Sequence, residues 1–592
     1  MTVNRRSFLS LAVGGAAGAL LAACGGAAAP SSSPAAASVS SAAPKPSSAA
    51  PASVSAAPSV AGSAPASAKP VASSSAAPAG SASAGGIKLP TYTPVQGPKP
   101  DLPGSPEGID PGYMSYPRTL FKSVPNPPGA GGDVNVFTWL ITQPPPPMDQ
   151  NAAWQEINKQ LNAKMNLNLV AFADLNTKFS TLMAGGDLPD MFLVPLLNTV
   201  QQLPQFLASK CADLTPYLGG DAVKDYPNLA NIPTLPWRST VYNGSIFGVP
   251  TTISAMNTAT FVNANLWDAV GAGDPKNGDD FKKILQELTK ASASQYGIGS
   301  AGAPGAATRS FFQGMFGSPN NWKLGSDGKL TKDYELDSSK AAVGYVRDLV
   351  SAGVWHPDSA TLNLINGQAN FIAGKMATWS TGWPNYPIMW EQGLGQKPQV
   401  KIHALKDFGA DGGKGIHYLG SAFYGMMALK KAPDARIKEL LGILNWLAAP
   451  FGSQESQLID YGVKDTDFTV DDKGNPVLTA KGKQETLVSW NEIGGRPPVL
   501  FDANSPEFAQ TAHGDEAALI PLGVLDPTIG FYSETNQAKG ASINNTLSSG
   551  IADIVTGRRP MTDYDQLVKD WRAAGGDQIR TELEQAIAAS KK

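Results

Sequence analysis

The sequence predicts an α/β fold that opens with a layer of strands covered by helices. Three short apolar runs are typical of buried strands: Val134–Leu140, Leu167–Ala173 and Met191–Val194. Between them lie two stretches with apolar residues at helical spacing. The order strand, helix, strand, helix, strand within about 60 residues is the opening of a doubly wound sheet.

Two helices separate these strands. The first carries Trp154, Ile157 and Leu161 on one face, and the second ends at the glycine pair 185–186. In doubly wound sheets, ligands bind at the carboxyl ends of the strands. Trp139 lies at one such end, so it is a candidate ligand contact, with core packing as the alternative.

Later stretches repeat the amphipathic pattern of buried helix faces. Apolar residues at helical spacing occupy 281–288, 343–350, 437–447 and 567–571. Because Trp154, Trp446 and Trp571 lie on apolar helix faces, we expect all three side chains in the core. Asp471–Asn475 is typical of a hairpin turn.

Length, charge and cysteine count narrow the class of protein. A chain of 592 residues is too long for one ordinary domain and long enough for two lobes and a tail. The formal net charge of −3 argues against a nucleic-acid partner. The two cysteines are Cys24 and Cys211; with Cys24 acylated there is no disulfide, and Cys211 is expected to be a buried, inert thiol.

Residues 1–23 have the features of an export signal. Arg5-Arg6-Ser-Phe-Leu resembles a twin-arginine signal, and the apolar run after it is too short and too rich in Gly and Ala to span a bilayer comfortably. Leu21-Ala-Ala-Cys24 resembles the bacterial lipobox. We therefore expect a lipid on Cys24 that holds the protein on the outer face of the cell membrane. The alternative is an ordinary leader with a chance cysteine.

A linker is predicted from Cys24 to residue 130. As far as about Gly86 it is almost wholly Ala, Ser, Pro, Gly and Val, which cannot bury enough apolar surface to offset chain entropy. The later part gains Tyr113 and Tyr116 and is compatible with packing on the folded part. The linker is either a tether that clears the cell envelope or a glycosylated spacer with no length requirement.

Several different short motifs occur between Val134 and the C-terminus. They are Gly186-Asp187-Leu-Pro-Asp190, Asp213-Leu-Thr-Pro-Tyr217, Asn243-Gly-Ser-Ile-Phe247-Gly-Val-Pro250, Val262-Asn-Ala-Asn-Leu266, Phe371-Ile-Ala-Gly-Lys375-Met-Ala377, and Asn445-Trp-Leu447 with Tyr461-Gly462. In type and order they resemble the extracellular solute-binding proteins of the sugar type, the receptors of ABC importers.

The resemblance implies a two-lobed α/β fold of the periplasmic-binding-protein type, with the ligand in a cleft between the lobes. Lobe one would take residues 131–252 and 412–515, and lobe two 253–411 and 516–592, with about three crossings that make a hinge. It implies a monomeric receptor that delivers a sugar or oligosaccharide to an ABC transporter permease, with no cofactor. Some relatives carry a calcium loop after the 281–288 helix; Ala291–Gln295 replaces it here, so no metal is expected.

Sugar binding needs flat aromatic faces and polar groups that hold hydroxyls. Aromatic residues gather directly after Lys375, where relatives often place a stacking tryptophan. Thr252 and Ser254 follow the hairpin motif and can offer hydroxyls or a hinge. The candidate ligand contacts are Trp139, Trp237, Thr252, Ser254, Trp379, Trp383 and Tyr386. Core packing is the alternative for the tryptophans.

Signatures of catalysis are missing. None of the four histidines has a metal-binding partner at helical spacing, and there is no intact phosphate loop or nucleophile elbow in the folded part. Asp187 and Asp190 fit turn and helix-end capping better than glycoside hydrolysis. We therefore expect no enzyme and no catalytic residue; the alternatives are an exported carbohydrate-active enzyme and a non-catalytic envelope lipoprotein.

Overall fold

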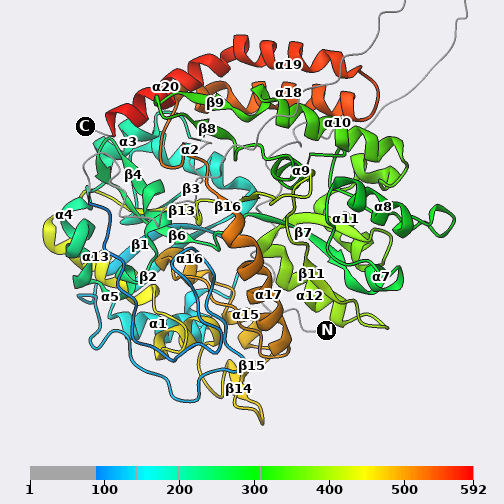
Figure 1. The fold of residues 1–592 in the computed structure, drawn as a ribbon. Coiled ribbons are helices and arrows are strands. Elements are labelled where there is room, and N and C mark those ends of the chain that lie inside the picture. Colours follow the sequence, from blue (N-terminus) through cyan, green and yellow to red (C-terminus); the bar gives the residue numbers. More distant parts are fainter. Residues whose placement is uncertain (1–87, 141–142, 196–199, 307, 591–592) are drawn as a thin grey trace, which may run out of the picture. The chain divides into compact units, whose positions relative to one another are not determined.

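The computed structural model describes residues 88–140, 143–195, 200–306 and 308–590 (Figure 1). The leader, Cys24 and the linker up to residue 87 lie outside the described residues. All described residues belong to one compact unit, which contains two α/β lobes, each with its own sheet and core. Among the described residues, no helix is long and apolar enough to cross a membrane.

Lobe one is built on a five-stranded sheet of order β2-β1-β3-β13-β6. The strands are β1 (Asp133–Leu140), β2 (Lys164–Ala171), β3 (Met191–Pro195), β6 (Gly248–Thr252) and β13 (Phe423–Leu429). β1 runs parallel to β2 and β3, whereas β13 runs antiparallel to both β3 and β6. The alternation predicted for 134–194 is confirmed, with α1 (Ala152–Leu161) and α2 (Leu175–Gly185) between the strands.

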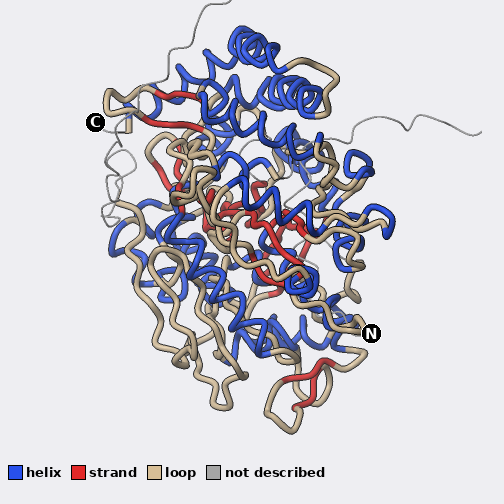
Figure 2. Tube along the Cα trace, turned by 45° about the vertical axis from the view of Figure 1, so that its right-hand side comes forward, coloured by secondary structure: helices blue, strands red, loops and turns tan. Residues whose placement is uncertain are grey.

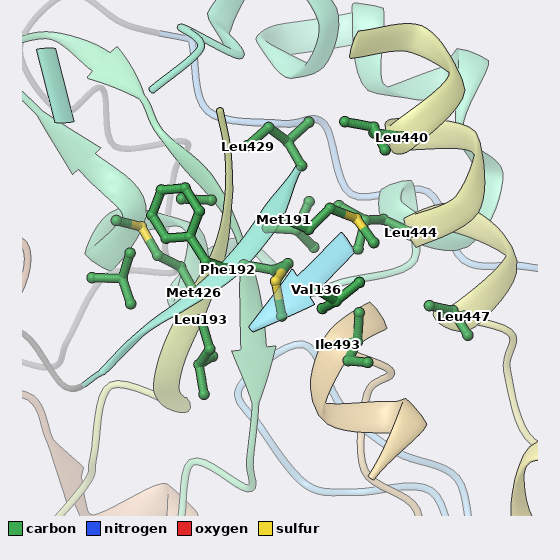
Figure 3. Packing of buried hydrophobic residues seen from close by; sticks show 14 of the residues in the cluster. Val136, Met191, Phe192, Leu193, Met426, Leu429, Leu440, Leu444, Leu447 and Ile493 are labelled. Atoms are coloured by element: carbon green, nitrogen blue, oxygen red, sulfur yellow. The ribbon is translucent and has the colours of Figure 1, made fainter. Parts of the chain in front are cut away.

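The remaining elements of lobe one cover this sheet. They are α3 (Leu203–Lys210), α4 (Thr215–Leu218), α5 (Pro227–Ala230), α6 (Thr234–Trp237), α13 (Asp434–Leu447), α14 (Gln454–Tyr461), α15 (Gly482–Glu485), α16 (Trp490–Gly494), and the hairpins β4 (Val241–Tyr242)–β5 (Ser245–Ile246) and β14 (Phe468–Val470)–β15 (Pro476–Leu478). Figure 3 shows Leu440 and Leu444 of α13 and Ile493 of α16 lying against Val136 and Met191 of the sheet. The hairpin turn predicted at 471–475 joins β14 to β15.

Lobe two is built on a three-stranded antiparallel sheet of order β10-β7-β11. Its strands are β7 (Thr258–Asn263), β10 (Thr378–Gly382) and β11 (Ile402–Ala404), with the small pairs β8 (Trp322–Leu324)–β9 (Leu330–Lys332) and β12 (His417–Tyr418)–β16 (Gly523–Val524). Helices surround these strands (Figure 2). They are α7 (Ala264–Ala269), α8 (Gly278–Leu288), α9 (Arg309–Met315), α10 (Asp337–Ser351), α11 (Leu364–Ile372), α12 (Tyr386–Leu394), α17 (Pro506–Leu519), α18 (Ala541–Val555), α19 (Tyr564–Trp571) and α20 (Asp577–Ala589).

The helix faces predicted from apolar spacing are buried. α8, α10, α13 and α19 turn those residues into the cores, and Trp154, Trp446 and Trp571 are core residues as expected. Cys211 is buried and free, and burial raises the pKa of its thiol to about 12, which fits an inert thiol.

Three connections cross between the lobes: 253–257 from β6 to β7, 405–422 from β11 to β13, and 495–505 from α16 to α17. Residues near the crossings pack across the sequence-based lobe boundaries. Tyr418 donates its hydroxyl hydrogen to carbonyls of lobe two, and Phe508 packs with Tyr386 in the core around β7. Crossing segments carry no periodic pattern, so the sequence places their boundaries poorly.

The N-terminal arm, residues 88–130, packs on the body although the sequence predicts linker as far as residue 130. Tyr113 and Tyr116 are buried in a small cluster with Phe451 and Phe501. Further along the arm, the backbone amide of Ser123 donates to both carboxylate oxygens of Glu455, at 3.1 and 3.0 Å. The aromatic residues supply the apolar surface that the preceding linker lacks, and this surface offsets the entropy of ordering the arm.

Removing the aromatic anchor of the arm should loosen it. We expect Tyr116→Ala to lower the free energy of unfolding by about 2–4 kcal/mol, since its ring packs at 5.3 Å on Phe451 and at 5.5 Å on Tyr461. Thermal melting measures the loss, and limited proteolysis should cut the arm faster. Tyr92→Ala, at a site 43% exposed on the same arm, is the control and should change neither. Equal protease resistance of the Tyr116→Ala variant and the natural protein would contradict the anchoring role.

Candidate functional site

The carboxyl edge of the lobe-one sheet brings together aromatic side chains from three strands. Trp139 lies at the end of β1, Phe172 follows β2, and Tyr424 lies at the start of β13, which arrives at the same edge because it runs antiparallel. The Trp139 ring centroid lies 4.7 Å from that of Phe172 and 4.7 Å from that of Tyr424. Trp139 and Tyr424 are both buried, at 2% and 5% exposure.

The polar atoms of this aromatic group lack partners. Trp139 Nε1 and the Tyr424 hydroxyl are buried and have no hydrogen-bond partner among the described residues. A buried donor without a partner costs free energy, and such groups in native proteins call for an explanation. Two of them at one sheet edge, beside flat apolar rings, form a surface suited to a ligand with both hydroxyls and apolar faces.

The end of β6 fixes α16 at this edge. Thr251 Oγ1 donates to the backbone oxygen of Glu492 at 2.8 Å, and Thr252 Oγ1 lies 3.1 Å from Gly495 O and 2.7 Å from Arg496 O. Gly495 is required here, because its φ is +73° and a Cβ would lie 2.0 Å from Pro250 O. The hydroxyl hydrogen of Thr252, a predicted ligand contact, is therefore used to hold the protein's own backbone.

Glu492 places a carboxyl beside Tyr424. Its side chain is partly exposed and makes no hydrogen bond or ion pair within the described part of the chain. Burial raises its pKa to about 7, and Arg496 lowers it by a smaller amount. Thr251, whose hydroxyl donates to Glu492 O, pairs with Gly425, the residue after Tyr424, which brings the two residues to the same edge. Burial and then the Glu492 charge raise the pKa of Tyr424. Sequence reasoning missed both residues, because neither stands in a motif.

Ser254 belongs to a polar cluster at the first crossing. Its Oγ donates to Glu516 Oε1 of α17 at 3.3 Å, and the backbone amide of Asp110 in the arm donates to Glu516 Oε2 at 2.7 Å. Burial raises the pKa of Asp110 to about 7 and that of Glu516 well above its ordinary value, and the charge of Asp110 raises it further. Ser254 thus connects the crossing to lobe two, which fits the hinge role that the sequence left open.

The aromatic candidates of lobe two lie together in the core around β7. Trp379 is fully buried and covers Gly367, where a Cβ would lie 2.1 Å from the indole. Trp383 packs nearly parallel to Phe261 at 6.0 Å, and Tyr386 lies 5.2 Å from Trp383. The Tyr386 hydroxyl lies 2.8 Å from Asp515 Oδ2. This packing favours the core alternative for all three, and their role as ligand contacts stays a prediction.

Trp237, the remaining candidate, is fully buried in the lobe-one core, and its Nε1 donates to Ile232 O at 3.4 Å. On lobe two, Asn385 lies just after β10, and its backbone segment meets the first crossing because Trp383 N donates to Asn257 O. Asn385 Oδ1 is buried without a partner among the described residues, so this edge also offers a free acceptor. No group of three or more His, Cys, Asp or Glu that could hold a metal occurs in the described ranges.

Comparisons with known proteins agree with this geometry. The family model for bacterial extracellular solute-binding proteins matches residues 152–463. Two relatives from Bacillus subtilis (strain 168) are 21% identical: "Lipoprotein LipO" over 484 residues (78% of this chain, 94% of the relative) and "Polygalacturonan/rhamnogalacturonan-binding protein YtcQ" over 486 residues (78% and 93%).

Solved structures share the fold. A solute-binding protein from Bifidobacterium longum infantis described as binding HMO superposes with a TM-score of 0.59 at 14% identity, covering 78% of this chain and 100% of its own. The N-glycan transport solute binding protein NgtS from Streptococcus pneumoniae gives a TM-score of 0.54 at 15% identity, with 78% and 100% covered. At these identities the likeness establishes the two-lobed fold.

The Asp110–Glu516 pair should make stability depend on pH. An acid whose pKa is higher in the folded state binds more protons folded than unfolded, so stability falls as pH rises from about 4 to about 7. We expect Glu516→Gln to reduce this fall, measured by thermal melting across that range. Glu507→Gln, on the exposed face of the same helix, is the control and should keep the natural slope. An unchanged slope in Glu516→Gln would show that the pair does not titrate in this window.

Proposed function

The chain belongs to the bacterial extracellular solute-binding proteins, and we propose that it is a receptor that delivers a sugar or oligosaccharide to the permease of an ABC transporter. The observation that carries the ligand class is the sheet edge where Trp139 and Tyr424 have two buried donors without partners among the described residues, in rings that pack at a tilt. Aromatic faces cover the C–H patches of a pyranose, and donors and acceptors hold its hydroxyls. The names of the relatives and solved structures support it, since several refer to poly- or oligosaccharides.

The proposed mechanism is closure around the ligand. Contacts from both lobes favour the closed form only as far as the ligand binds that form more tightly. The three crossings at 253–257, 405–422 and 495–505 provide the hinge. We place the division at these crossings, which moves α17 and β12 to lobe two relative to the sequence-based bounds of 131–252 and 412–515 for lobe one and 253–411 and 516–592 for lobe two. The closed form is the one that the permease recognises, and the receptor acts as a monomer without catalysis of its own.

We place the protein on the outer face of the cell membrane, held by lipid on Cys24. The membership in an extracellular family and the lipoprotein relative support export and anchoring. A lipid anchor keeps the receptor near its permease, which raises the local concentration of loaded receptor. The linker after Cys24 lets the binding lobes move away from the membrane surface.

Loss of the Tyr424 hydroxyl should weaken saccharide binding. We expect Tyr424→Phe to raise the Kd for the saccharide about fivefold to tenfold, the effect of one lost hydrogen bond, with the melting temperature unchanged or higher because an unpartnered buried hydroxyl is removed. Isothermal titration calorimetry over a panel of neutral, amino and acidic oligosaccharides measures it, with product analysis in parallel. Tyr217→Phe, whose hydroxyl lies 2.8 Å from Asp434, is the control. Turnover of a saccharide without a stable complex would favour the enzyme alternative and overturn the receptor.

Membrane anchoring through Cys24 and saccharide binding by the two lobes should be separable. We expect Cys24→Ala to move the protein from the membrane fraction to the soluble exported fraction while the saccharide Kd stays within about twofold of the natural protein. Fractionation followed by calorimetry on the released protein measures both. Cys211→Ala is the matched control, since this thiol is buried in lobe one, and it should stay in the membrane fraction. Continued membrane association of Cys24→Ala would mean that another segment anchors the chain.

A further inference from the structure

The packing of α16 on the end of β6 fixes the backbone position of Glu492. α16 is held by the Thr251 and Thr252 hydroxyls, and its end approaches Pro250 so closely that only glycine fits at 495. This docking leaves little freedom for the backbone of Glu492. The carboxyl is therefore presented at the same edge as Trp139 and Tyr424.

The charges around Glu492 leave its carboxyl uncompensated. Arg496, the charged group whose field lowers its pKa, is bound by both oxygens of Asp460, at 3.1 and 2.9 Å, and the side chains of that pair are 7% and 10% exposed. The charges of Arg496 and Asp460 cancel each other, so the ionised carboxylate of Glu492 remains as a net negative charge at the edge.

Two elements packed against α16, β6 and α13, bring no unpaired cation to the edge. β6 has no ionisable side chain, and β13 brings only Tyr424. The two cations of α13, Arg436 and Lys438, lie in the first half of the helix. Lys438 pairs with Asp434, and Arg436 pairs with Glu439 and with Asp190 before β3. Arg496, which Asp460 binds, is the cation whose charge lowers the pKa of Glu492, so a ligand that reaches this edge meets a carboxyl that makes no hydrogen bond within the described part of the chain.

We propose that the saccharide bound at this edge is uncharged or amine-bearing where it meets Glu492, and that oligomers of uronic acids are excluded. This inference rests on the proposed function and specifies its ligand class. Sugar hydroxyls and ammonium groups donate hydrogen bonds to a carboxylate, whereas a uronate carboxylate would face a like charge in a partly desolvated place. The ligand would then differ in charge from the polygalacturonan for which one relative is named.

The discrimination should weaken at low pH. Protonation of Glu492 removes the repulsion, and its pKa of about 7 puts this change between about pH 8 and about pH 5.5. Uronates stay ionised throughout this range, so the ligand does not change. Burial also raises the pKa of Asp110 to about 7 and that of Asp515 to about 6, and it raises the pKa of Glu516 well above its ordinary value. These groups lie at the crossing and in lobe two, so the Glu492→Gln variant is needed to separate their titration from that of Glu492.

The test compares ligands that differ only in charge. Calorimetry at about pH 8 and about pH 5.5 measures the Kd of each ligand. Tetramers of galacturonate, glucuronate and mannuronate are compared with their methyl esters, and tetramers of glucosamine with tetramers of N-acetylglucosamine. For the natural protein we expect each ester that binds to do so at least about tenfold more tightly than its acid at the higher pH, with the ratio several-fold smaller at the lower pH.

Two variants isolate Glu492. Glu492→Gln keeps the shape and should bring the acid-to-ester ratio close to one at both pH values, whereas Glu492→Asp should keep the discrimination. Tyr424→Phe should weaken acid and ester equally, so the ratio remains. Melting temperatures check that each variant folds. An acid that binds the natural protein as tightly as its ester, or a ratio unchanged in Glu492→Gln, would overturn the inference. If the natural protein binds no saccharide of the panel or of the neutral set, the proposed function itself fails.

Discussion

The pairing of β13 with both β3 and β6 is the constraint on which the other features depend. β13 follows most of lobe two in the sequence, yet it lies inside the lobe-one sheet, where it hydrogen-bonds antiparallel to the central strand β3 and to the edge strand β6. Without it, the facing backbone groups of β3 and β6 would be buried and unpaired, at a cost for each group. The chain therefore has to return to lobe one after entering lobe two, and the connections that carry it across are the ones proposed as the hinge.

The same pairing assembles the candidate site. Because β13 runs against β6, its first residues arrive at the edge where the parallel strands end, which puts Tyr424 against Trp139. α16 lies later in the same lobe-one segment as β13 and is held at that edge by the threonines of β6. The site thus combines residues from segments far apart in the sequence, each fixed by backbone pairing or close packing, which is the kind of support that a binding geometry requires.

Polar groups near the edge divide into two kinds. The hydroxyls of Thr252 and Ser254 are used inside the protein, one to hold α16 and the other to join the crossing to α17. Trp139 Nε1 and the Tyr424 hydroxyl have no such use within the described chain. Since unpaired buried donors reduce stability, their presence at one edge is better explained by a ligand than by packing. Trp379 Nε1, in the core around β7, also lacks a partner among the described residues, so the argument for Trp139 and Tyr424 rests on their position together at the strand ends.

The sequence by itself determined the elements and the family: apolar spacing placed the opening strands and helices, and ordered motifs identified the family, because both signals are local. It also selected Trp139, because a strand end is visible in a hydrophobic pattern. It did not reveal Tyr424 or Glu492, and it offered the buried Trp379, Trp383 and Tyr386 as ligand candidates on equal terms. Only the tertiary structure decided which polar atoms lack a hydrogen-bond partner and which charges remain uncompensated. Both properties depend on contacts between segments that no local pattern records.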